Sequence, residues 1–179
     1  MAEAKPFFPV KLICGIIASE QRIFEKAEEY LLNNYGAVDR TSALFKFDFT
    51  DYYEKQMGKD LKRKFLSFGN LFPPDKLSEI KLQTNKLEEV IKKEAKAPVR
   101  VVNLDPGYLT SSALILATAK DFAHRIPLKN GIYAHLELLF SKKGVRTLSW
   151  TYPDYKTEEY QKFFIDVRKI YLAQLKSKA

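Results

Sequence analysis

Acidic, basic and hydroxyl-bearing side chains gather in three short stretches of this chain, and together they have the chemistry of a polar site. The first stretch is Asn103-Leu-Asp-Pro-Gly-Tyr108, whose start overlaps the end of an apolar run, Val99–Leu104. Pro106 presets one backbone angle and Gly107 permits a positive one, so the pair favours a chain break. The pattern predicts a strand that stops at Asp105 and presents its carboxylate there as a catalytic group.

The second stretch is Lys120-Asp-Phe-Ala-His-Arg125. Histidine is the side chain best suited to proton transfer near neutral pH, so His124 and Asp121 are predicted to act in catalysis. Lys120 and Arg125 are predicted to bind a phosphate, the arginine through two parallel hydrogen bonds. The alternative is a structural arrangement in which Asp121 pairs with one of the two cations and His124 bonds a backbone group.

The third stretch is Trp150-Thr-Tyr-Pro-Asp-Tyr155, which again places aromatic hydroxyls and a carboxylate at a chain break. Asp154 and Tyr152 are predicted to contact a ligand. Tyr53 and Tyr133, which lie elsewhere in the chain, are expected to line the wall of the same cleft.

A divalent cation is the cofactor that these carboxylates would suit. Asp51 and Asp105 would meet at one edge of the sheet if each ends a strand, and Mg²⁺ prefers oxygen ligands. The sequence therefore predicts both residues as metal ligands, with Mg²⁺ as the candidate ion. The alternative is that Asp51 caps a short helix, as aspartate commonly does.

Several better-known sites are excluded by their missing motifs. The chain has no Gly-x-x-x-x-Gly-Lys-Ser/Thr phosphate loop, no Gly-x-Gly-x-x-Gly after a strand, no Cys/His zinc spacing and no Gly-x-Ser-x-Gly elbow. His135 is followed two residues later by Glu137, whereas two-histidine phosphoesterases have serine or threonine at that position. No catalytic role is therefore predicted for His135.

Composition predicts a folded protein with one domain spanning residues 1–179. Hydrophobic residues make up 46% of the chain and charged residues 29%, which is typical of a globular protein. No apolar run reaches the ~18 residues of a membrane helix, so no membrane association is expected. The single cysteine, Cys14, lies in an apolar run and is expected to be a buried thiol in a reducing cytoplasm.

The net charge of +8 is a reason to consider nucleic acid as a partner. The basic residues are spread along the chain, and no RNP-like motif, zinc-finger spacing or arginine-rich block is present. Lysines outnumber arginines, and ammonium groups serve solubility more readily than base recognition. A solvated surface is therefore favoured, and nucleic acid binding stays as an alternative.

The elements that must position these side chains can be placed from hydrophobic periodicity and breaker residues. The expected strands are Leu12–Ala18, Thr41–Phe49, Glu79–Gln83, Val99–Leu104, Ala113–Thr118, Ile132–Phe140 and Val145–Trp150. Helices are expected between Ser19 and Gly36, between Asn85 and Pro98, and over Tyr160–Leu175. The order predicts an α+β fold with a mixed, mostly antiparallel sheet, two strand-helix-strand units, a hairpin and a C-terminal helix.

Several motifs in the same order resemble a known family. They are Phe47–Glu54 with Met57-Gly58, Val102–Leu109, Ala117–Arg125, Gly131–Tyr133 and Trp150–Tyr155. Together they resemble the domain-of-unknown-function 4416 family of bacteria and archaea, over nearly the whole chain. The resemblance implies a single cytoplasmic domain with no assigned activity. Members are sometimes labelled GTP-binding proteins, a label that the missing phosphate loop does not support.

These observations lead to two hypotheses from different classes. The first is a cytoplasmic protein with a polar cleft that binds a phosphorylated or otherwise anionic small ligand, in which a metal ion would assist hydrolysis or phosphoryl transfer. The second is a non-enzymatic module that binds RNA or serves as a protein-interaction scaffold.

Overall fold

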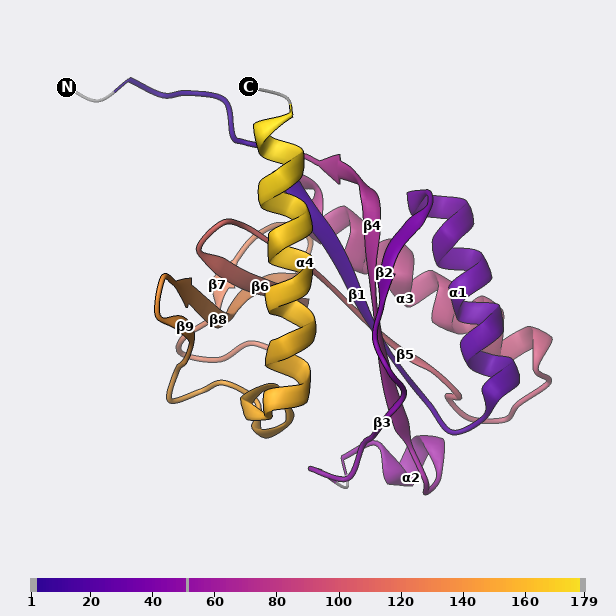
Figure 1. The fold of residues 1–179 in the computed structure, drawn as a ribbon. Coiled ribbons are helices and arrows are strands. Elements are labelled where there is room, and N and C mark those ends of the chain that lie inside the picture. Colours follow the sequence, from indigo (N-terminus) through magenta and orange to yellow (C-terminus); the bar gives the residue numbers. More distant parts are fainter. Residues whose placement is uncertain (1–2, 51, 178–179) are drawn as a thin grey trace.

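The computed structural model describes residues 3–50 and 52–177 of the chain (Figure 1). Within these residues, one sheet of nine strands has helices packed on both faces, and all of its strand pairs are antiparallel. The predicted α+β fold is therefore confirmed. No helix in the described ranges is long and apolar enough to cross a membrane.

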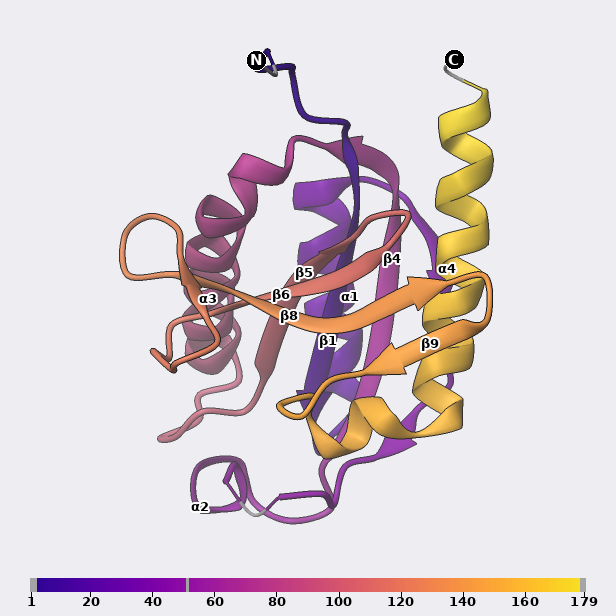
Figure 2. The same cartoon turned by 90° about the vertical axis from the view of Figure 1, so that its left-hand side faces the viewer.

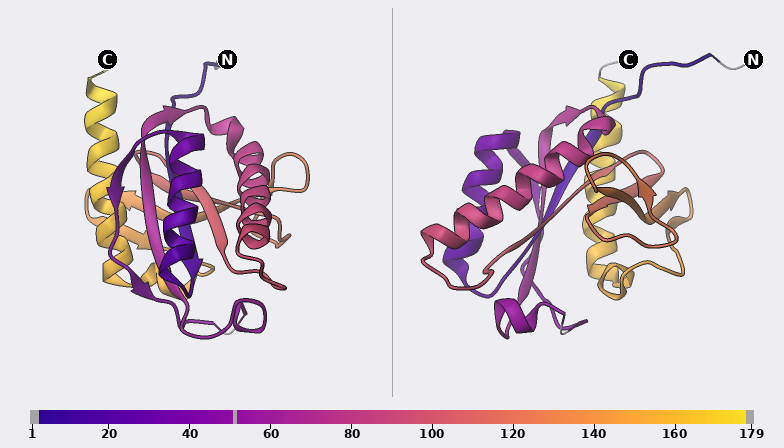
Figure 3. Two further views of the ribbon diagram at one scale, coloured as in Figure 1. Left: turned by 90° about the vertical axis from the view of Figure 1, so that its right-hand side faces the viewer. Right: turned by 180° about the vertical axis from the view of Figure 1, so that it is seen from behind.

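The first half of the chain forms two interleaved strand-helix-strand units. The elements are β1 (Val10–Ala18), α1 (Gln21–Tyr35) and β2 (Val38–Thr41), then β4 (Lys62–Phe72), α3 (Leu77–Glu94) and β5 (Asn103–Leu109). The sheet order β2-β4-β1-β5 places one strand of each unit between the two strands of the other, which is the split β-α-β arrangement. Both helices lie on one face of the sheet (Figure 3).

The second half of the chain extends the sheet beyond β5. The added strands are β6 (Ala113–Thr118), β7 (Ile126–Pro127), β8 (Tyr133–Ser141) and β9 (Gly144–Thr147). The strand order continues β5-β6-β8-β7, and β9 pairs with β8. The predicted hairpin is confirmed, with Ser141 opposite Gly144. Figure 2 shows β6 and β8 running across the direction of β1 and β4.

Short elements and the last helix complete the fold. They are β3 (Phe45–Lys46), α2 (Glu54–Met57), the 3₁₀ turns η1 (Pro74–Lys76) and η2 (Pro153–Lys156), and α4 (Glu158–Lys176). The predicted C-terminal helix is thus confirmed. It packs on the face of the sheet opposite α1 and α3 (Figure 1). The predicted strand Thr41–Phe49 is instead two short strands, β2 and β3, joined by a few unpaired residues.

The core has two layers, and β1 contributes to both. Cys14 and Ile16 pack with α1 and α3, whereas Ile13 packs with the aromatic side chains of α4. Successive side chains of a strand point to opposite faces, so a strand covered on both sides reads as one unbroken apolar run. This explains the pattern of residues 12–18, and it confirms Cys14 as a buried thiol.

The Asp-Pro-Gly sequence is not a chain break, which corrects the predicted strand end at Asp105. Strand β5 begins at Asn103 and runs through Asp105, Pro106 and Gly107, and Asp105 lies opposite Gly15 of β1. Gly107 does not have the positive φ of a turn glycine. It is required by a close approach, because a Cβ there would lie 2.5 Å from the carbonyl oxygen of Ile115 on β6.

Pro106 determines where β5 and β6 separate. The two strands pair only at Gly107–Leu109, opposite Leu114–Leu116. Both backbone groups of Leu104 bond side chains of α3, so they point away from β1. Because these directions alternate along a strand, Pro106 also faces away from β1, towards β6. Proline has no N–H to donate there, so the ladder ends and the sheet forks.

The strand predicted at Glu79–Gln83 is wrong, since these residues lie inside α3. The alternation that favoured a strand belongs to a helix face with buried polar residues, among them Lys81, Thr84 and Glu88. The helix begins at Leu77, soon after Pro73 and Pro74, so the predicted start of this helix at Asn85 is also wrong. Pro73 and Pro74 lie at the start of the 3₁₀ turn η1, where the first N–H groups need no partner within the turn, so they precede the helix without interrupting it.

The close approach at Gly107 gives a stability prediction. Gly107→Ala should lower the free energy of unfolding by about 1–3 kcal/mol, because the new methyl group would clash with the β6 backbone. Gly69→Ala is the matched control, since a Cβ there would meet its nearest atom at 3.4 Å. Urea unfolding measures both. Equal losses for the two variants would show that the approach of β5 to β6 does not require glycine.

Candidate functional site

A cavity of about 840 Å³ opens at the fork between β5 and β6. Its walls come from the polar face of α3, the start of β5, the end of β6, η2 and the segment before α2. The lining residues of that last segment are Phe47, Phe49, Thr50, Tyr52 and Tyr53. Beyond the fork, Asn103–Pro106 of β5 pairs only with β1, and Ala117 and Thr118 of β6 pair only with β8. The missing ladder therefore creates the space that the cavity occupies.

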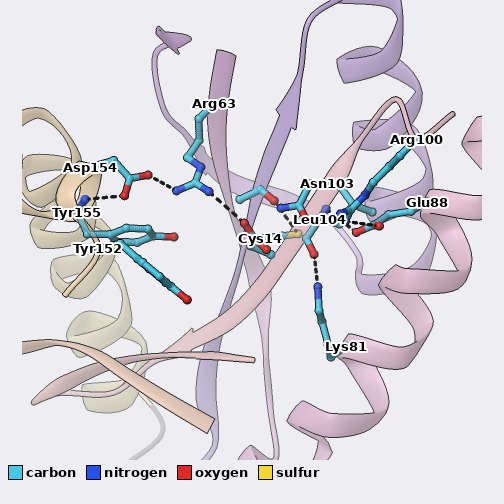
Figure 4. A network of polar contacts seen from close by, with 12 residues as sticks. Cys14, Arg63, Lys81, Glu88, Arg100, Asn103, Leu104, Tyr152, Asp154 and Tyr155 are labelled. Atoms are coloured by element: carbon cyan, nitrogen blue, oxygen red, sulfur yellow. Dashed lines mark hydrogen bonds and ion pairs between the residues drawn. The ribbon is translucent and has the colours of Figure 1, made fainter. Parts of the chain in front are cut away.

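A buried arginine joins the two carboxylates that the sequence placed in separate motifs. Arg63, on β4, is 5% exposed and donates one hydrogen bond to Asp154 and another, at 3.1 Å, to Asp105 (Figure 4). Its guanidinium carbon lies 4.6 Å from the ring centroid of Phe47. A buried guanidinium stays charged, so the two acids compensate it where water cannot.

The polar face of α3 replaces the strand partner that β5 lacks at the fork. Lys81 donates from Nζ to the Leu104 carbonyl at 2.7 Å, and Glu88 accepts from the Leu104 N–H at 2.7 Å. Arg100 then donates to Glu88 and to Asn103, each at 2.5 Å. Figure 4 shows these groups on the side of β5 opposite to Arg63. The backbone groups of Leu104, which have no strand partner on this side, are therefore hydrogen-bonded by side chains of α3.

Two cationic side chains lie over aromatic rings of the segment that precedes α2. The ammonium nitrogen of Lys120 lies 3.6 Å from the ring centroid of Tyr52, and the guanidinium carbon of Arg100 lies 5.7 Å from that of Tyr53. The first contact joins the β6–β7 connection to the segment before α2. Both contacts are cation–π interactions, which hold a charge beside an apolar surface.

The wall at η2 rests on a buried histidine. The His135 ring stacks on that of Tyr152, with centroids 4.9 Å apart and 3° between their planes. Arg125 donates to the Tyr152 hydroxyl at 2.8 Å and to His135 Nδ1 at 3.2 Å. Glu137 accepts from the Tyr152 backbone N–H at 2.8 Å. The ring of Tyr152 is therefore fixed from two sides.

Both ring nitrogens of His135 face groups of the protein, so neither is placed to transfer a proton to a ligand. Arg125 always donates, so Nδ1 must accept and the ring proton belongs on Nε2. Nε2 lies 2.6 Å from the Glu137 carboxylate, though at an angle outside that of a hydrogen bond. His124 Nε2 also approaches Nδ1, at 3.2 Å. His135 lines the cavity but acts as a support for Tyr152.

Burial perturbs the acids and phenols around the cavity. It raises the pKa values of Glu88, Glu137 and Asp154 above those of ordinary carboxyl groups. Nearby cations oppose this increase in pKa at Glu88 and Asp154, and His135 and the Tyr152 backbone N–H oppose it at Glu137. Burial likewise raises the pKa of Tyr53, and Asp105 adds to this increase. These shifts favour the protonated forms, so the tyrosine hydroxyl is a hydrogen-bond donor at neutral pH.

The structure brings together some of the predicted site residues and leaves others outside. Those that line the cavity are Tyr53, Asp105, Lys120, Tyr152 and Asp154. Those that do not are Asp121, His124, Arg125 and Tyr133. Asp121 is exposed, His124 stacks on Trp150, and Arg125 supports the wall from behind.

Of the two predicted metal ligands, Asp51 and Asp105, the structure describes only Asp105. Asp51 lies outside the described residues, and Asp105 gives one of its oxygens to Arg63. Among the residues that are described, no group of three or more His, Cys, Asp or Glu side chains could hold a metal ion. The Mg²⁺ site remains a prediction that depends on Asp51.

Sequence reasoning missed the residues that organise the cavity, which are Arg63, Lys81, Glu88, Arg100 and Asn103. A usable signal existed on α3, where Lys81, Asn85 and Glu88 recur at helical spacing on the face that the helix buries. Arg63 gave no such signal, because it lies in a basic cluster with Lys62 and Lys64.

Comparison with known proteins gives one match. The family model described as "Domain of unknown function (DUF4416)" matches residues 8–171. No curated protein and no solved structure matches the chain. The matched range contains every residue that lines the cavity.

The role of Arg63 can be tested by removing its charge. Arg63→Met should lower the free energy of unfolding by about 3–5 kcal/mol, because it leaves two carboxylates near or inside the core without a cation. Arg22→Met is the control, because Arg22 forms its ion pair at the exposed surface, where its loss should leave stability nearly unchanged. Chemical denaturation of both variants measures the difference. A loss for Arg63→Met as small as the control's would contradict this role.

The raised pKa of Glu137 gives a pH prediction. The folded state holds the proton of this carboxyl more tightly than the unfolded state, so its contribution to stability decreases as pH rises from the ordinary value of 4.5 through the folded pKa. Glu137→Gln removes this titration. We subtract the unfolding free energy of the wild type from that of the variant. This difference should increase with pH across the window, by about 1.4 kcal/mol for each tenfold difference in proton affinity between the folded and unfolded states. Urea unfolding between pH 4 and 7 measures the two curves, and parallel curves would refute the shift.

Proposed function

This chain belongs to the DUF4416 family, and we propose that its cavity binds a small phosphorylated or otherwise anionic ligand. The family description names no activity, so the proposal rests on the geometry of the site. Its volume of about 840 Å³ lies within the range of small-molecule sites, and it combines apolar walls with a few placed polar groups.

The observation that carries the proposal is a difference between the arginines and the lysines of the cavity. Arg63 and Arg100 each form an ion pair with an acid of the protein. Lys81 and Lys120 also line the cavity, but neither forms an ion pair with any carboxylate that the structure describes. Lys81 is close enough to Glu88 to oppose the raised pKa of that carboxyl group, but no carboxylate of the described residues contacts either ammonium group directly. Both can therefore attract an anion from solution, at a site where partial burial strengthens the attraction.

Asp105 gives the site a second kind of contact. One of its oxygens accepts from Arg63, while its side chain is 22% exposed and its other oxygen has no partner among the described residues. That oxygen can accept a hydrogen bond from a hydroxyl or N–H group. A ligand with both an anionic group and a hydrogen-bond donor would use both features.

Hydrolysis or phosphoryl transfer is the catalytic form of this proposal. Asp105 is the predicted catalytic residue that lines the cavity, whereas His124 and Asp121 do not. A reaction would therefore depend on Asp105, with Mg²⁺ held by Asp105 and Asp51 where metal assistance is used. The proposal also takes over the cytoplasmic location inferred from the single cysteine.

Anion binding can be tested at the exposed lysine. Lys120→Ala should weaken binding of inorganic pyrophosphate about fivefold, which corresponds to the loss of one partly exposed charge contact. Lys129→Ala removes the same charge from an exposed loop outside the cavity and should change nothing. Isothermal titration at low ionic strength measures both. The same titration with Mg²⁺, on wild type and on Asp105→Asn, tests the metal form.

Two results would contradict this function. Equal affinities for Lys120→Ala and Lys129→Ala would place anion binding outside the cavity. Strongly salt-dependent RNA binding that survives Lys120→Ala, without any pyrophosphate binding, would instead favour the RNA-binding or scaffold module.

A further inference from the structure

The geometry points to a chemical class for the ligand: a planar aromatic ring joined to an anionic group such as a phosphate. This inference rests on the anion-binding function proposed above. It specifies a second part of the ligand, an aromatic ring, in addition to the anionic group. It follows from the positions of the aromatic rings and cations in the cavity.

Aromatic side chains reach the cavity from two separate segments. Tyr52 and Tyr53 pack edge to face before α2, with ring centroids 5.0 Å apart, and Phe47 packs on Tyr53 at 5.9 Å. Tyr152 and Tyr155 of the η2 turn also line the cavity. Rings on two sides of a cavity provide the flat surfaces on which another ring stacks.

Part of this aromatic surface is exposed at the cavity. Tyr52 is 57% exposed and Phe49 is 44% exposed, and both line the cavity. Single exposed apolar side chains are common, but exposed apolar side chains that gather at one place are typical of ligand-binding grooves and other contact surfaces. A ring bound between the walls would cover apolar area that otherwise faces water.

The cations of the cavity stand directly on these rings. Lys120 lies over Tyr52, and Arg100 lies over Tyr53. An anion that reaches Lys120 is therefore placed beside the Tyr52 ring. A ligand with a ring next to its anionic group would gain both the charge contact and the stacking contact, while an aliphatic anion would gain only the first.

The part of the wall that Tyr152 forms is held in place by contacts outside the cavity. His135 stacks behind Tyr152, and Arg125 holds the Tyr152 hydroxyl. A ring held in this way need not be ordered when a ligand binds, which leaves more of the contact energy for affinity. The open oxygen of Asp105 supplies an acceptor for an N–H or hydroxyl group of the ligand.

The test uses pairs of phosphates that differ in a ring. Adenosine 5′-monophosphate is compared with ribose 5-phosphate, and phenyl phosphate with methyl phosphate, by isothermal titration of the full chain. The ring-bearing member of at least one pair should bind about tenfold more tightly, which is the affinity expected from stacking on an aromatic side chain.

Three variants test which residue causes the tighter binding of the ring-bearing phosphate. Tyr52 is exposed, and Tyr52→Leu replaces its ring with an apolar side chain that cannot stack. This variant should lose most of the preference for the ring-bearing phosphate. Lys120→Ala should weaken both members of a pair to a similar degree. Tyr30→Leu, on α1 and outside the cavity, is the matched control and should leave all affinities unchanged.

The outcomes separate this inference from the function on which it rests. Suppose that both members of each pair bind equally well and that Lys120→Ala weakens this binding. That result would overturn the inference that the ligand carries an aromatic ring, and it would leave the proposed anion site in place. A ring preference that Tyr52→Leu does not reduce would also overturn this inference. No binding of any of the four phosphates would overturn both this inference and the anion-binding function.

Discussion

The bridge from Arg63 to Asp105 and Asp154 is the interaction on which the rest of the site depends. A guanidinium inside a protein cannot lose its charge, so a chain that places arginine on a central strand must bring acids to it. Asp105 comes from β5 beside β1, and Asp154 from the turn that leads into α4. The bridge therefore ties the last third of the chain to the middle of the sheet. It also settles why two distant motifs each contain an aspartate.

The fork in the sheet is the second constraint, and a single residue explains its position. Pro106 faces β6 without an N–H, so the ladder cannot continue past Gly107 towards the start of β5. An open edge would leave the polar groups of Leu104 unpaired, and α3 supplies Lys81 and Glu88 to bond them. The helix therefore carries buried charges for a reason of backbone chemistry. The cavity follows from the separation of the strands.

Much of the fold could be predicted from the sequence, because alternation and helical spacing report on burial. The runs at residues 12–18 and 113–118 and the stripe of α4 gave correct elements. The Asp-Pro-Gly motif misled because its residue types also form turns, and only the neighbouring strand shows that Gly107 answers a close approach. Asp105, Lys120 and Asp154 were identified by type. Arg63 could not be, since its burial depends on partners that lie 42 and 91 positions away.

The structural hydrogen bonds described above and the ligand binding that we propose involve the same residues, and this has a physical consequence. Arg63 holds one oxygen of Asp105, which fixes the direction of the other oxygen into the cavity. Leu104 holds Lys81 in place through one hydrogen bond, while the ammonium group has further donors to offer. Each of these two cavity-lining groups is thus positioned by a contact that the fold already requires. A site built in this way is ordered before its ligand arrives, so binding need not supply the free energy of ordering it.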